Sequence, residues 1–219
     1  MTNPSTPRIS ARKRPQQARS QQLVAQILAA AGRVLAREGA QRFTAARVAE
    51  EAEISIGSLY QYFPNKAAIL FQLQTDEWQQ TTELLHNILG DVQKPPYERL
   101  RVLVHAFIRS ECEEAQMRTA LSDAAPLYRD APEAKDAKAS GDRIFQFFMQ
   151  QVLPDASEET RALAKNLITT TLGAVGKQFS ETPRTSAEIE TYADAMADMF
   201  CAYLEGLRRG LSGAVEEAG

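Results

Sequence analysis

Two stretches near the N-terminus decide the fold: TAARVAEEA at residues 44–52 and, after a short turn, SIGSLYQYF at residues 55–63. Thr44 and Ser55 each stand directly before a short run of helical periodicity, where N-capping residues are favoured. Pro64 ends the second run, because the residue before a proline is pushed out of the helical region. The pattern predicts two short helices around a tight turn, which is a helix-turn-helix.

The two faces of the second short helix differ in character. Ile56, Leu59 and Phe63 have the spacing of an apolar face, and we expect all three to face inward. A helix that reads DNA packs one face on its scaffold and presents a small, polar face to the base edges. The candidates for that polar face are Gly57, Ser58, Gln61 and Tyr62.

Helical periodicity continues through the rest of the chain, and there is no period-2 strand pattern, internal repeat or heptad. The fold class is therefore predicted to be all-α. It would consist of an N-terminal three-helix DNA-binding domain at residues 20–66 and a C-terminal helical domain at residues 67–219. The expected helices cover about residues 20–38, 45–52, 56–62, 66–89, 97–114, 117–121, 134–152, 157–179 and 186–211.

Charge is distributed unevenly along the 219 residues, although the formal net charge is only −3. Residues 1–66 carry ten Lys and Arg against four Asp and Glu, whereas residues 67–219 carry fifteen against twenty-four. A basic front and an acidic remainder indicate that only the front meets a polyanion. Residues 1–19 are expected to form a disordered basic arm, for which the alternative to DNA binding is a merely solvated tail.

The composition argues for a cytoplasmic protein with no membrane contact. No run of 18 apolar residues appears, and the basic N-terminus lacks the apolar stretch of a secretory signal. Cys112 and Cys201 have no metal-ligand spacing, so we expect reduced thiols and neither a metal nor a cofactor.

Around the turn and the second helix the sequence resembles the TetR family of regulators. The resemblance lies in Ser55-Ile-Gly-Ser-Leu-Tyr60, Tyr62-Phe63, Asn65-Lys66 and Ile69-Leu70, within about residues 20–75. It implies that Thr44, Ser55, Tyr60 and Lys66 contact phosphates or frame the recognition helix, with the polar-face residues nearer the bases. The complete set of expected DNA contacts is Thr44, Arg47, Ser55, Gly57, Ser58, Tyr60, Gln61, Tyr62 and Lys66.

One position departs from the family pattern, and three aromatic residues have an alternative role. The turn position that usually holds glycine in the family holds Glu53 here, and a left-handed backbone would cost a non-glycine residue about 1 kcal/mol. Tyr60, Tyr62 and Phe63 can also be simple core residues, a role that we prefer for Phe63 and leave open for Tyr60 and Tyr62.

The C-terminal domain is expected to bind a small hydrophobic effector. His105, Arg109 and Cys112 follow one another at i, i+4 and i+7, so they can line one helix face toward a ligand or, less readily, a metal. The alternative is that the aromatic residues close into a solid core. The candidate ligand residues are Trp78, His105, Phe107, Cys112, Met117, Tyr128, Phe148, Thr170 and Gln178.

The last two expected helices, 157–179 and 186–211, carry more apolar surface than one core stripe needs. We expect them to form a two-fold homodimer interface. Gly173 and Gly176, inside the first of these helices, point to a close helix contact within or between subunits.

Three functions are weighed from the sequence. The first is a repressor that a small hydrophobic effector releases from a palindromic, double-stranded DNA operator. The second is an architectural or constitutive dimeric DNA-binding protein without an effector. The third is an enzyme, for which the sequence offers no nucleophile elbow, phosphate loop or zinc signature.

Overall fold

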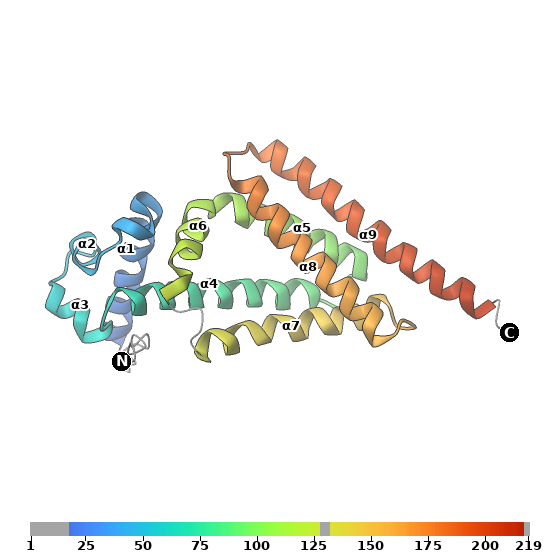
Figure 1. The fold of residues 1–219 in the computed structure, drawn as a ribbon, viewed down its shortest axis with the longest axis horizontal. Coiled ribbons are helices and arrows are strands. Elements are labelled where there is room, and N and C mark those ends of the chain that lie inside the picture. Colours follow the sequence, from blue (N-terminus) through green and yellow to red (C-terminus); the bar gives the residue numbers. More distant parts are fainter. Residues whose placement is uncertain (1–17, 128–131, 217–219) are drawn as a thin grey trace, which may run out of the picture. The chain divides into compact units, whose positions relative to one another are not determined.

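The computed structural model describes residues 18–127 and 132–216 (Figure 1). Within these two ranges every regular element is a helix, so the expected all-α fold is confirmed. The expected basic arm falls almost wholly outside the described residues, as does Tyr128. The elements are α1 (Ala18–Arg42), α2 (Ala45–Glu51), α3 (Ile56–Tyr62), α4 (Lys66–Leu89), α5 (Pro96–Glu113), α6 (Ala115–Ala124), the 3-10 helix η1 (Ala125–Leu127), α7 (Pro132–Val152), α8 (Glu158–Ser180) and α9 (Ser186–Glu216).

The helix ends follow local signals closely, with two differences at α1. The helix begins at Ala18, so residues 18 and 19 are helical where we expected the arm. Gly39 interrupts the helix as predicted, with φ of 73° and ψ of 171°, but the chain resumes helical geometry as far as Arg42. The α6 helix is also longer at both ends than the expected 117–121, and α9 continues to Glu216, past the expected end at residue 211.

Contacts divide the described chain into two compact units. The first contains α1 to α3, the part of α4 up to Gln79, and the described residues between Gln116 and Ala137. The second contains Gln80–Ala115 and the described residues from Lys138 onward. The boundary between the two units therefore lies within α4, between Gln79 and Gln80. The domain boundary expected from the sequence was at residue 66, where this helix begins.

The first unit is organised around α2, which packs against both α1 and α3 (Figure 1). Leu59 and Phe63 are fully buried in its core, as expected. Ile56 is 41% exposed, so the expectation that it faces inward is wrong. Helical side chains lean toward the N-terminus of their helix, and Ile56 is the first residue of α3. Its side chain therefore extends past the end of the helix, away from the core.

The turn between α2 and α3 keeps the glycine-type conformation although it contains Glu53. Glu53 has φ of 54°, and in the described chain it is the single non-glycine residue with positive φ. Its amide donates to the Glu50 carbonyl at 3.0 Å, and the Ile54 amide donates to the Ala49 carbonyl at 3.0 Å. These two bonds form a Schellman motif, which holds the left-handed residue in place. The helix-turn-helix is thus complete without its usual glycine.

The second unit is organised around α5, which packs against both α8 and α9. At Gly176 of α8 an added Cβ would lie 3.1 Å from the Phe107 ring and 3.4 Å from the Ile108 side chain. This approach explains Gly176 as a close helix contact within the subunit. A Cβ at Gly173 would meet nothing within 4 Å, so no contact in the described chain explains that glycine.

A row of paired basic and acidic residues, here called the α5–α9 ladder, runs along the contact between these two helices. Arg101 pairs with Asp198, His105 with Asp194, and Arg109 with Glu190. The other His105 ring nitrogen lies 2.9 Å from a Glu190 carboxylate oxygen. Arg109 first, and His105 second, lower the pKa of the Glu190 carboxyl below its usual value.

The strained turn generates a prediction about stability. Replacing Glu53 by glycine should raise the free energy of unfolding by about 1 kcal/mol, because glycine adopts positive φ without a Cβ clash. Urea unfolding followed by circular dichroism measures the change. Ala46→Gly, at an exposed position of α2, is the control and should lower stability by about 1 kcal/mol. A Glu53→Gly protein less stable than wild type would show that the turn is not strained.

Candidate nucleic-acid interface

Three polar side chains of the first unit cap the N-termini of successive helices. Thr44 Oγ1 accepts the Arg47 amide at 3.3 Å, and Ser55 Oγ accepts the Ser58 amide at 3.0 Å. Asn65 Oδ1 accepts the Ala68 amide at 2.9 Å. Each cap satisfies a backbone donor that a helix start leaves unpaired. The caps therefore fix where α2, α3 and α4 begin, and with them the orientation of α3.

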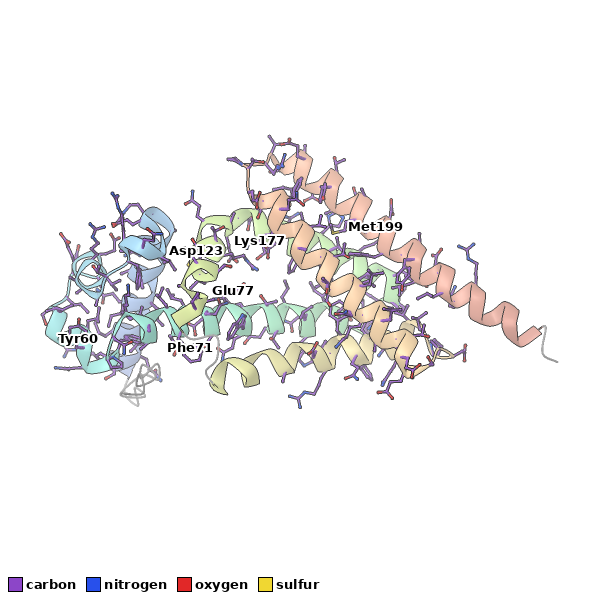
Figure 2. The ribbon with its side chains drawn as sticks, in the orientation of Figure 1. Tyr60, Phe71, Glu77, Asp123, Lys177 and Met199 are labelled. Atoms are coloured by element: carbon purple, nitrogen blue, oxygen red, sulfur yellow. The ribbon has the colours of Figure 1, made fainter. Side chains whose placement is uncertain are left out.

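One face of α3 is open to solvent. Leu59 and Phe63 occupy the opposite, buried face, and Tyr62 is half-buried against the core of the first unit. Tyr60, labelled on α3 in Figure 2, is 42% exposed. The structure thus confirms Phe63 as a core residue and separates the two tyrosines that the sequence left open, because Tyr60 is outward and Tyr62 is half-buried. The exposed residues of α3 are Ile56, Gly57, Tyr60 and Gln61.

Gly57 and Ser58 differ in how far the protein itself accounts for them. A Cβ at Gly57 would meet only the Ser55 hydroxyl, at 3.8 Å, so no contact in the described chain requires glycine there. The Ser58 hydroxyl lies 2.8 Å from the Ser55 hydroxyl, and the Ser58 side chain is half-buried. Ser58 therefore belongs to the cap of α3 as well as to its expected polar face.

Lys66 and Thr44 are the expected phosphate contacts on either side of α3 in the sequence. Both are exposed, Lys66 as the first residue of the 24-residue α4 and Thr44 immediately before α2. The N-terminus of a long helix carries a partial positive charge, which adds to the charge of a lysine beside it. The start of α4 is consequently the most favourable place for an anion among the predicted contact residues.

Arg47 lies in different surroundings. Its guanidinium pairs with the Glu38 carboxylate, and it lines an open hollow of about 690 Å³. The pair balances the Arg47 charge within the protein and joins α1 to α2. The lining residues are Arg37, Glu38, Arg42, Arg47, Glu50, Glu51 and Glu53, with more acidic than basic side chains.

A second brace between α1 and α2 holds the helix-turn-helix on its scaffold. Glu51 lies 2.8 Å from the Arg33 guanidinium and 3.1 Å from that of Arg37. Hydrogen bonds from Arg33 first, and Arg37 second, lower the pKa of the Glu51 carboxyl. Gln26 of α1 also donates to the Ala52 carbonyl at 2.7 Å, beside the turn. Local sequence patterns do not indicate these braces, because the partners are 14 to 26 residues apart.

The candidate effector residues are divided between the two units. Trp78 and Met117 pack against the core of the first unit. Phe148 is fully buried in the core of the second unit, and Phe107 and Cys112 are packed against that core. Thr170 and Gln178 are exposed on α8, and His105 belongs to the α5–α9 ladder.

The two cysteines of the second unit have little chemical reactivity. Burial raises the pKa values of the Cys112 and Cys201 thiols, which keeps them in the unreactive protonated form. In the part of the chain that the structure describes, no group of His, Cys, Asp and Glu is placed to hold a metal ion. No described helix is long and apolar enough to cross a membrane.

Two family models match the chain. The model described as "Bacterial regulatory proteins, tetR family" matches residues 27–73, which contain α2 and α3. The model described as "Tetracyclin repressor-like, C-terminal domain" matches residues 95–207. The second match alone covers more than half of the 219 residues.

A curated relative shares part of the sequence. The HTH-type transcriptional repressor KstR of Rhodococcus jostii (strain RHA1) is 27% identical over 121 residues, which are 54% of this chain and 54% of that protein. The chain therefore spans about half the length of this relative.

Solved structures share the fold over most of their length. The fatty acid degradation regulator FadR from Bacillus halodurans is 14% identical with a TM-score of 0.64, over 85% of this chain and 96% of that one. A TetR-family regulator of Haemophilus influenzae is 21% identical with a TM-score of 0.62, over 83% and 98%. A TetR-like regulator from Rhodococcus sp. RHA1 is 22% identical with a TM-score of 0.60, over 92% and 100%.

Proposed function

Since this chain belongs to the tetR family of bacterial regulatory proteins, we propose that it is a dimeric repressor released from a palindromic operator by a small hydrophobic effector. As a member of that family it is a regulator rather than an enzyme. The observation that carries the proposal is the open face of α3, held outward by Leu59 and Phe63 and framed by the start of α4. A cytoplasmic location follows from this function.

The proposed contact with DNA places α3 in the major groove. A groove of B-DNA about 12 Å wide admits one helix, and side chains on its outer face then reach the base edges. Tyr60 and Gln61 are exposed on that face, and Gly57 lets the backbone approach closely. Lys66 and Thr44, which are both exposed, are proposed to contact phosphates beside the groove. Arg47, which already pairs with Glu38, would contribute less than its charge suggests.

The proposed dimer uses the outer faces of α8 and α9. On α8, Ala164 and Ile168 are buried, whereas Leu163 is 64% exposed and Leu167 is 47% exposed. Met199, labelled on α9 in Figure 2, is 50% exposed. Two neighbouring helices that each leave large apolar side chains in solvent are typical of an interface between identical subunits.

The effector is proposed to bind among the apolar side chains of the second unit. An effector can release DNA only if it binds the DNA-free conformation more tightly, which in typical regulators is a coupling of about 1–3 kcal/mol. Phe107 and Cys112 are half-buried, which is compatible with contact to an apolar ligand. Phe148 is fully buried, so it could support the side chains that line such a site but would not contact the ligand itself.

The first prediction from this proposal concerns Lys66. Lys66→Ala should weaken DNA binding and reduce the slope of log affinity against log salt by about one per subunit, because one phosphate contact is lost. Fluorescence anisotropy with the promoter duplex beside the gene, at several salt concentrations, measures both effects. Lys94→Ala, which removes an exposed lysine from the second unit, should leave the slope unchanged. An equal slope in Lys66→Ala and wild type would remove α4 from the interface.

The second prediction concerns the dimer. Leu167→Glu should shift the protein from dimer to monomer at micromolar concentration, because the interface would have to bury an unpaired carboxylate. Light scattering coupled to gel filtration measures the mass. Val92→Glu places the same charge on a 62% exposed position in the loop before α5 and should remain dimeric. Wild-type protein that is monomeric under these conditions would contradict the proposed interface.

The third prediction concerns the effector. At least one neutral, lipophilic compound should lower affinity for the promoter duplex about 5- to 150-fold, and should raise the thermal midpoint of the DNA-free protein. Polyanions should act only through ionic strength, because the candidate residues are mainly apolar. A thermal-shift panel followed by anisotropy tests this. A panel in which nothing that binds also releases DNA would favour the constitutive DNA-binding dimer instead.

A further inference from the structure

Ile56 is an apolar side chain at an unusual place on the molecular surface. It begins α3 and is 41% exposed, while the core of the first unit is closed by Leu59 and Phe63 without it. A single exposed apolar residue needs no explanation on an ordinary surface. Here, however, it begins the one helix that the proposed function puts into the major groove, at the end where its side chain extends past the helix.

The polar groups nearest to Ile56 along the chain are already engaged. The Ser55 and Ser58 hydroxyls lie 2.8 Å apart, and Ser55 Oγ also accepts the Ser58 amide at 3.0 Å. At this end of α3 the exposed Ile56 side chain lies beside two hydroxyls that bond to each other. Further along the helix, Tyr60 lies one turn after Ile56, and Gln61 lies one turn after Gly57. Ile56 and Tyr60 therefore form one row along the helix, and Gly57 and Gln61 form another.

The major groove offers one apolar feature to such a side chain. Each base pair shows a distinct pattern of donors and acceptors there, and only thymine adds a methyl group, at C5. An aliphatic side chain gains by covering that methyl, because both lose contact with water. It gains nothing comparable from the amino group of cytosine or from the acceptors of guanine.

We propose that Ile56 makes the regulator select thymine at one position of each operator half-site, by packing against its 5-methyl group. This inference rests on the proposed function, because it requires α3 to lie in the major groove. Ile56 is then a specificity-determining residue, in addition to the polar face of α3 that the sequence indicated.

The test begins with a duplex enriched from a random library by the full-length protein. Each thymine of that duplex is replaced in turn by deoxyuridine, which removes only the 5-methyl group. Wild-type protein should lose affinity about fourfold at one thymine of a half-site, the loss expected for one buried methyl. Anisotropy titrations of the substituted duplexes measure the loss.

Ile56→Ala should bind the thymine duplex more weakly than wild type and should lose nothing further at that position when deoxyuridine replaces thymine. Ile56→Val keeps a branched side chain and should retain the preference for thymine. Val92→Ala, which shortens another exposed apolar side chain, should match wild type on every duplex. A thermal midpoint equal to that of wild type confirms that Ile56→Ala is folded, as its exposure predicts.

Two results would overturn the inference while leaving the proposed function intact. One is an enriched duplex on which no deoxyuridine substitution distinguishes wild type from Ile56→Ala. The other is an Ile56→Ala protein that loses affinity equally on all duplexes and remains sensitive to the missing methyl, which would place Ile56 against the sugar-phosphate backbone. Failure to enrich any duplex would instead reject the proposed function itself.

Discussion

The burial of Leu59 and Phe63 is the constraint on which the helix-turn-helix depends. A seven-residue helix has too few internal hydrogen bonds to persist alone, so its packing determines both its existence and its orientation. With these two side chains fully buried, Tyr60 and Gln61 must point outward. The Schellman turn and the braces from α1 to α2 then hold the supporting helix in place, and the outward face becomes a rigid surface.

Interactions between residues close in sequence explain why most of the helix-turn-helix was predictable. Thr44, Ser55 and Asn65 accept hydrogen bonds from backbone amides only three residues away, so their capping roles can be predicted from the local sequence. The expectation that Ile56 faces inward was wrong because helical spacing does not distinguish the first position of a helix from the others. A side chain at that position extends past the helix end. The charge balance of Arg47 was also hidden, since Glu38 belongs to a different helix.

The second unit was predictable in its helices but not in its contacts. Periodicity identifies which residues of α5 and α8 are apolar, but not which turn of one helix meets which turn of the other. Gly176 is explained by the Phe107, Glu111 and Ile108 side chains beside it, which belong to another helix. His105 looked like a ligand residue until its two carboxylate partners appeared, 85 and 89 residues further along the chain.

The even spacing of the α5–α9 ladder allows its basic and acidic residues to pair in more than one register. Basic residues stand at 101, 105 and 109, and acidic residues at 190, 194 and 198, so each partner series advances by four. If the antiparallel helices slid by four residues, about 6 Å, two of the three pairs would re-form with new partners. The charges therefore determine that α9 lies beside α5, but they discriminate poorly between neighbouring registers. Register must be set by the buried shapes beneath them, such as Ala193, Ala197 and Leu204.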